Sequence, residues 1–239
     1  MGDCFGETYF RSYSTFESRN LSVEELILNR ELAISNWLWT DDSNMAFSIF
    51  NILKTFGKID EYSLAQSFAE RYEVGRGYGP AMHGLLQNLK LGGIWHQEAK
   101  ALFNGQGSFG NGSAMRVSPV GAFFADNLKK VCVEAEKSAI VTHINPEAIV
   151  GAIAVAVATA LAWKFKQEKV RPNRKEFIEE ILPFLNESEV RKGTRLAQEL
   201  DSTFSTKNAA EILGCGYKVS CPDTVPFCLY CAWRIFGQL

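Results

Sequence analysis

The sequence has no excess of basic residues, because 25 Lys and Arg stand against 27 Asp and Glu, giving a formal net charge of −2. Nucleic-acid backbones are bound through a positive surface field, so we expect no nucleic-acid partner. Cysteines are also few, and 239 residues bury a sufficient core without disulfides. Only Cys228 and Cys231 have the spacing of many zinc sites, but they lie in the apolar stretch PFCLYCAWRIF. We favour buried thiols that pack as small hydrophobic side chains over zinc ligands there.

A secretory leader and a long membrane-spanning run are not evident. The first ten residues, MGDCFGETYF, contain neither a basic segment nor an apolar one, so we expect a cytoplasmic protein. The longest uncharged run, Ala148 to Trp163, is shorter than the ~20 residues that cross a bilayer, and we expect no membrane partner. We predict a buried central helix, which begins at Asn145 as N-cap with Pro146 at its first position and Glu147 in its first turn.

Alternating strand patterns are almost absent, whereas apolar residues recur at helical spacing along most of the chain. One such helix starts near Met45 and is predicted to stop at Gly57. The fold class is therefore all-α with about ten helices, and no linker divides the chain, so we expect a single domain over residues 1–239. Further helices are predicted near 80–91, 113–124, 127–140, 173–185, 187–200, 206–213 and 224–236.

The stretch TDDSNMA, residues 40–46, places a hydroxyl and two adjacent carboxylates before an apolar helix. In one interpretation, Asp42 or Ser43 caps the helix and the acids complement its macrodipole. In another, Thr40, Asp41 and Asp42 bind a hard divalent cation, which would offset the repulsion between the two acids. The two interpretations are compatible.

A glycine-rich stretch, FNGQGSFGNGSAMR, spans residues 103–116. Closely spaced glycines let backbone amides turn inward and bind a phosphate or diphosphate before a helix. The stretch is neither a dinucleotide-binding fingerprint, because no strand precedes it, nor a P-loop, because no Lys-Ser/Thr pair follows the glycines. Phe103 and Phe109 flank this loop and are expected either to stack on a purine or simply to pack.

His143 follows Thr142 immediately before the predicted central helix. An isolated histidine is commonly a satisfied structural residue, and His83 and His96 have no acidic or glycine-rich neighbours in the sequence. At the mouth of a helix, His143 could instead donate a hydrogen bond to a phosphate or ribose oxygen of a ligand.

Taken in order, GDCFGE, TDDSNMA, RGYG at 76–79, FNGQGSFGNGSAMR, TH at 142–143 and VPFCLYCAWR resemble the ADP-ribosylglycohydrolase family. The branch most similar releases ADP-ribose from serine and from poly(ADP-ribose). The resemblance implies an orthogonal bundle of helices, two Mg²⁺ ions in a cleft, and hydrolysis of a glycosidic bond to ADP-ribose. The implied partner is ADP-ribose or an ADP-ribosylated protein.

The resemblance also implies roles for individual residues. Thr40, Asp41 and Asp42 match the first metal cluster, and the two aspartates, with Glu7, are the expected catalytic carboxylates. Such carboxylates stabilise positive charge on the sugar as the leaving group departs. The expected substrate-binding residues are Gly77, Gly79, Phe103, Gly107, Ser108, Phe109, Gly110, Asn111 and His143.

Three departures from the family pattern affect these expectations. The family's second metal cluster, a Gly-Gly-Asp-Thr-Asp-Thr stretch, does not occur, and the first helix is expected to be incomplete, so we expect a domain truncated at both ends. The family's gating glutamate is replaced by Phe10, and Glu7, which shares a helical face with Asp3, is either its substitute or an exposed helical residue. Besides an enzyme, the sequence therefore allows an ADP-ribose-binding homologue with little or no activity, or a crystallin-like structural protein.

Overall fold

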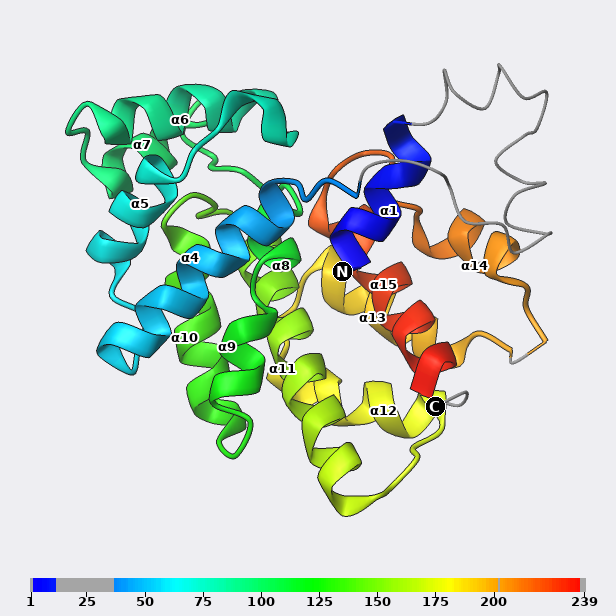
Figure 1. The fold of residues 1–239 in the computed structure, drawn as a ribbon. Helices are drawn as coiled ribbons and strands as arrows, with labels where there is room; N and C mark the ends of the chain where they lie inside the picture. Colours follow the sequence, from blue (N-terminus) through cyan, green and yellow to red (C-terminus); the bar gives the residue numbers. More distant parts are fainter. Residues whose placement is uncertain (1, 12–36, 202, 237–239) are drawn as a thin grey trace.

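The computed structural model describes residues 2–11, 37–201 and 203–236, and this part of the chain is all-α (Figure 1). It contains no β-strand, only an isolated bridge between Gly110 and Ser220. The helices are α1 (Gly2–Arg11), α4 (Asp41–Phe56), α5 (Glu61–Glu70), α6 (Pro80–Lys90), α7 (Trp95–Ala101), α8 (Gly112–Met115), α9 (Ser118–Phe123), α10 (Leu128–Ile140), α11 (Pro146–Glu168), α12 (Arg174–Ile181), α13 (Glu189–Glu199), α14 (Thr206–Leu213) and α15 (Cys221–Phe236), with 3-10 turns η1 (Val74–Arg76) and η2 (Leu182–Phe184).

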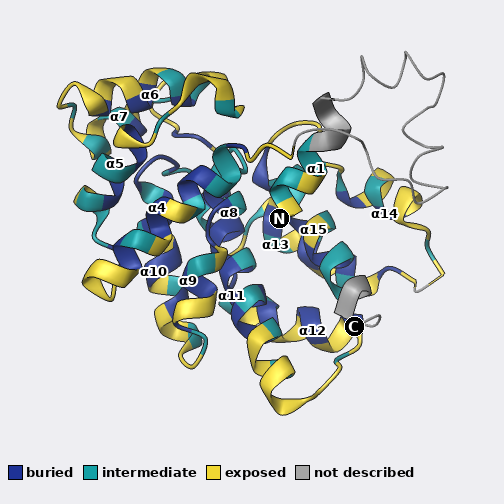
Figure 2. Cartoon of the chain, viewed as in Figure 1, coloured by how far each residue is buried: buried dark blue, intermediate teal, exposed yellow. Residues whose placement is uncertain are grey.

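Helix α11 runs through the middle of the molecule, between the group containing α4, α5 and α10 and the group containing α12 to α15 (Figure 1). It begins as predicted, because the Asn145 side chain accepts a hydrogen bond from the Glu147 amide and Pro146 occupies its first turn. By length and composition α11 could cross a membrane. However, 61% of its most apolar 18-residue stretch is buried inside the protein (Figure 2). Its small residues let α8, α9, α10 and α15 pack directly on it.

Local signals also placed other helix ends correctly. Helix α4 ends where Gly57 adopts a left-handed conformation and its amide bonds to the Leu53 carbonyl. Helix α14 covers the predicted residues 206–213.

The single helix predicted over 113–124 is wrong, because the structure has α8 and α9 there with a break between them. The break follows from Pro119, which cannot donate to the Met115 carbonyl four residues earlier and would clash with it. Two other boundaries also shift. The helix predicted over 173–185 finishes in the 3-10 turn η2, and α15 begins at Cys221 rather than 224.

Candidate active site

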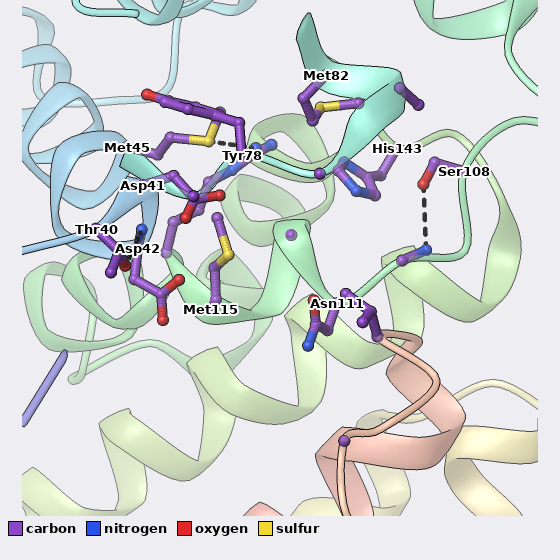
Figure 3. A pocket seen from close by; sticks show the side chains of 18 of the residues that line it. Thr40, Asp41, Asp42, Met45, Tyr78, Met82, Ser108, Asn111, Met115 and His143 are labelled. Carbon is purple, nitrogen blue, oxygen red and sulfur yellow. Dashed lines mark hydrogen bonds between the residues drawn. The ribbon is translucent and has the colours of Figure 1, made fainter. Parts of the chain in front are cut away.

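A cavity of about 1250 Å³ opens between the start of α4 and the glycine-rich stretch. Figure 3 shows Asp41 and Asp42 on one side of it and Ser108, Asn111 and His143 on the other. The two motifs therefore face one hollow, although residues 47–102 lie between them in the sequence. The predicted site residues that line it are Glu7, Thr40, Asp41, Asp42, Gly77, Gly79, Phe103, Ser108, Phe109, Gly110, Asn111 and His143.

Thr40 is the N-cap of α4, so the prediction that Asp42 or Ser43 caps this helix is wrong. Its backbone is extended, and its hydroxyl accepts a hydrogen bond from the Asp42 amide at 3.3 Å. The same hydroxyl donates to Asp3 Oδ1 at 2.7 Å. Because Thr40 takes the capping position, both Asp41 and Asp42 are left in the first turn, where their carboxylates reach the cavity.

Asp3 is a site residue that the sequence reasoning did not single out, although it belongs to the GDC motif. Its carboxylate accepts hydrogen bonds from the backbone amides of Thr40 at 2.9 Å and Ser43 at 3.3 Å. Burial opposes its ionisation, but hydrogen bonds from Ser43 and Thr40 outweigh that effect and lower the pKa of Asp3. Asp3 therefore joins α1 to the start of α4 as a charged carboxylate at the cavity wall.

The acids of α4 have the opposite shift. Burial, followed by the charge of Asp42, raises the pKa of Asp41 to about 7. Burial, followed by the charge of Asp3, raises the pKa of Asp42 to about 6. Both shifts have the same cause, since several carboxylates share a partly desolvated space and each ionised group makes the next one harder to ionise. A bound cation would relieve this repulsion.

The RGYG turn, residues 76–79, lines the cavity next to Asp41 and Asp42. Gly77 has φ of +87°, and a Cβ there would lie 3.6 Å from Asp41 Oδ1, so the turn runs directly past this carboxylate. The Tyr78 hydroxyl accepts a hydrogen bond from the side-chain nitrogen of Asn44, Nδ2, at 3.1 Å. Arg76 lies over the Trp39 ring, 4.2 Å from its centroid, and donates to the Trp39 carbonyl. These contacts tie the turn to the first turn of α4 and to the segment that precedes it.

Within the glycine-rich stretch, Gly107 is the predicted residue that does not line the cavity. Its φ is +71°, and a Cβ would meet Ile144 Cγ1 at 2.3 Å, so it allows the loop to pack on the start of α11. The expectation of inward-facing amides also needs correction. The Gly110 amide donates to Ser108 Oγ at 3.2 Å and the Asn111 amide donates to the Val219 carbonyl, so both are already engaged.

Phe103 and Phe109 lie at the cavity edge, 52% and 46% exposed. Their centroids are 6.4 Å apart with the rings tilted by 43°, which is already contact distance for an aromatic pair. A purine therefore has no room between them and would stack on the outer face of one ring.

His143 is only 3% exposed and reaches the cavity beside Gly110 and Gly112. Its Nδ1 forms a 2.6 Å hydrogen bond with the Thr142 hydroxyl. Burial, aided by the charge of Arg116, lowers the pKa of His143 to about 3, so the ring is neutral at physiological pH. Arg116 and Lys218 also line the cavity, and neither was predicted. Arg116 stands at the end of the glycine-rich motif, whereas Lys218 carried no sequence signal.

Two other predictions concern metal binding and gating. Within the described ranges, no group of three or more His, Cys, Asp or Glu side chains is arranged to hold a metal ion. Cys228 is exposed and Cys231 only partly buried, so the prediction that both are buried thiols is wrong. Both lie on α15, whose core face is made by Val225, Leu229 and Tyr230, and Cys231 packs at the edge of that core. The side chain of Phe10, at the position of the family's gating glutamate, lies outside the described residues.

A family model described as ADP-ribosylglycohydrolase matches residues 1–238. The chain is 35% identical over 156 residues to ADP-ribosylhydrolase ARH3 of Gallus gallus, covering 63% of this chain and 41% of the relative. It is 30% identical over 199 residues to ADP-ribosylhydrolase ARH3 of Mus musculus, covering 79% and 52%. An uncharacterized protein of Archaeoglobus fulgidus is 33% identical over 204 residues, covering 80% and 59%. The chain thus spans about half the length of the curated relatives it matches.

Proposed function

The chain belongs to the ADP-ribosylglycohydrolase family, as the match over residues 1–238 establishes, and from this premise we propose that it hydrolyses the glycosidic bond between ADP-ribose and a protein side chain or ADP-ribose polymer. One observation carries the proposal: a single cavity joins the carboxylates of α4 to the glycine-rich loop and its aromatic rings. A dinucleotide-like ligand with a sugar at one end, a diphosphate in the middle and a purine at the other end fits this distribution of groups.

The donor set at the acidic end suits Mg²⁺, which prefers carboxylate and hydroxyl oxygens. Thr40, Asp41 and Asp42 would hold the ion, since the Thr40 hydroxyl, with one hydrogen bond accepted and one donated, keeps a lone pair. The remaining ligands would be water, which Mg²⁺ retains readily. When bound, the ion would supply positive charge that orients the ribose hydroxyls and a water molecule.

The protein's own groups divide the remaining work. The carboxylates of Asp41 and Asp42 would stabilise the positive charge that develops on the ribose as the glycosidic bond breaks. At the other end, the Ser108 hydroxyl accepts from the Gly110 amide and keeps its own proton to donate to a diphosphate oxygen. The exposed faces of Phe103 and Phe109 offer the purine a stacking surface.

The test combines binding with turnover. ADP-ribose is titrated into the protein by calorimetry with and without Mg²⁺, and ADP-ribose release is then measured from serine-modified and arginine-modified peptides. We expect Mg²⁺-dependent release that Asp42→Asn abolishes. The matched control is Asp126→Asn, because Asp126 is exposed and does not line the cavity. Release that persists in Asp42→Asn would contradict the proposal.

A second candidate is a protein that binds ADP-ribose without cleaving it. It is favoured by one observation, that no group of three or more His, Cys, Asp or Glu side chains in the described ranges is arranged to hold a metal ion. Calorimetric binding without release from either peptide would favour this function and exclude hydrolysis of serine-linked and arginine-linked ADP-ribose.

A further inference from the structure

Arg116 is fully buried yet has no ion-pair partner in the described part of the chain. Its guanidinium stacks on the Phe68 ring, 4.4 Å from the centroid, and its Nε has no hydrogen-bond partner. Its Nη2 donates to the Ser138 carbonyl at 2.9 Å and to the Thr142 hydroxyl at 2.8 Å. Burying an arginine with no carboxylate in salt-bridge contact is costly, even though the charge of Asp41 acts on Arg116 from farther away, so this arrangement calls for an explanation beyond packing.

The Thr142 hydroxyl lies between Arg116 and His143. A guanidinium only donates hydrogen bonds, so the Thr142 oxygen must accept from Arg116. Thr142 is 0% exposed, and its own proton therefore requires an acceptor inside the protein. The other partner of the hydroxyl is His143 Nδ1, at 2.6 Å. The hydroxyl proton consequently points to Nδ1, which must carry a lone pair.

The opposite nitrogen of the ring lies beside Gly110 and Gly112, which line the cavity together with His143. A Cβ on Gly112 would lie 2.9 Å from His143 Nε2, and one on Gly110 would lie 3.4 Å from it. If Nδ1 accepts a hydrogen bond, a neutral imidazole carries its proton on Nε2. The ring then presents an N–H donor beside Ser108 and Gly110, where the proposed function places a diphosphate or ribose oxygen.

We propose that Arg116 is a positioning residue, which orients the Thr142 hydroxyl so that His143 is held in the Nε2–H tautomer as a donor to an oxygen of the bound nucleotide. The identity of the ligand rests on the proposed function, whereas the tautomer is a property of the free protein. Arg116 does not contact the ligand in this account. It acts through its hydrogen bond to Thr142 and the hydrogen bond from the Thr142 hydroxyl to His143, which together fix where the Thr142 proton points.

The first measurement is the ¹⁵N spectrum of the histidine rings in the free protein, in which only His83, His96 and His143 contribute. His143→Gln assigns the signals. We expect His143 to be the neutral Nε2–H tautomer between pH 5 and 8. Thr142→Ser should keep that tautomer, because it keeps the hydroxyl, whereas Thr142→Val and Arg116→Met should give a mixture of tautomers. The Nδ1–H form in the wild type, or an unchanged tautomer in Thr142→Val, would overturn the proposal.

The second measurement is ADP-ribose affinity. Thr142→Val should weaken binding about three- to tenfold, as expected for one lost hydrogen bond, and Thr142→Ser should restore it. Combined with His143→Gln, the Thr142→Val change should cause no further loss. Thr194→Val is the matched control, because Thr194 is also 0% exposed but its hydroxyl bonds only within α13 and lies away from the cavity. A further loss in the double variant would overturn the inference.

The two measurements separate this inference from the proposed function. If the wild type shows the Nε2–H tautomer but binds no ADP-ribose, the function is wrong and the positioning of His143 stands. If Arg116→Met does not fold, Thr142→Val alone decides the outcome, since it leaves the buried guanidinium in place.

Discussion

Replacing Gly112 by alanine is a direct perturbation of the nucleotide end of the cavity. The added methyl group would lie 2.8 Å from His143 Cε1 and 2.9 Å from Nε2, and ordinary carbon contacts begin near 3.5 Å. The ring must therefore move by roughly half an ångström. It cannot do so freely, because Thr142 holds its other nitrogen at 2.6 Å. The methyl group would also cover the nitrogen that we expect to donate to the ligand.

We expect Gly112→Ala to lower the free energy of unfolding less than Gly107→Ala does. Overpacking costs about 1–3 kcal/mol, and replacing a helical glycine by alanine returns up to about 1 kcal/mol, so the net destabilisation is about 0–3 kcal/mol. Gly107→Ala gives the contrasting case, with a 2.3 Å clash against Ile144 and a left-handed backbone. It should cost about 2–5 kcal/mol of unfolding free energy, without adding any atom to the cavity wall.

The assay is urea unfolding of both variants, followed by ADP-ribose titration under conditions in which each is folded. We expect Gly112→Ala to lower ADP-ribose affinity at least tenfold with modest destabilisation. Gly107→Ala should be strongly destabilised but keep affinity within a few-fold of wild type when folded. Wild-type affinity in Gly112→Ala would refute the position assigned to the nucleotide, and the reverse order of stabilities would refute the packing argument.

Two further predictions concern charge at the two ends of the cavity. The pKa of Asp41, raised to about 7, means that the metal-free folded protein holds a proton that the unfolded chain releases near pH 4. The contribution of Asp41 to the unfolding free energy is present below pH 4 and is lost as pH rises to 7. In EDTA, the unfolding free energy of Asp41→Asn should therefore equal that of wild type at pH 4 and exceed it at pH 8 by up to about 4 kcal/mol. A constant difference across this range in chemical unfolding would contradict the reasoning. Lys218 is an exposed cation at the cavity wall, so Lys218→Gln should weaken ADP-ribose binding about two- to fivefold at low salt. The difference should vanish near 0.5 M salt in calorimetric titrations, and a salt-independent difference would contradict an electrostatic role.

Features set by neighbouring residues were predictable from the sequence. Gly57 ends α4 and Asn145 with Pro146 begins α11, because a left-handed stop and a side-chain cap act over one helical turn. We expected the two aspartates of α4 and the glycine-rich loop to line one cavity. That expectation came from the family resemblance and not from the spacing of residues in the sequence. The break between α8 and α9 was missed, although Pro119 carried the signal for it.

Features that depend on distant contacts were not predictable. The hydrogen bond from the Thr40 hydroxyl to Asp3, 37 residues earlier, had no local signal. The contact of Gly107 with Ile144, which lies 37 residues later, had none either. The same holds for Arg116, whose partners Ser138 and Thr142 belong to the end of α10 and the turn that follows it. In each case the residue type was visible but its partner was not.

The most direct test of the central claim, that one nucleotide sugar spans both ends of the cavity, is a crystal structure of the protein with ADP-ribose and Mg²⁺. We predict the diphosphate beside Ser108 and His143, and the terminal ribose hydroxyls beside Asp41 and Asp42. ADP-ribose bound outside this cavity, or with its ribose turned away from the two aspartates, would contradict the account.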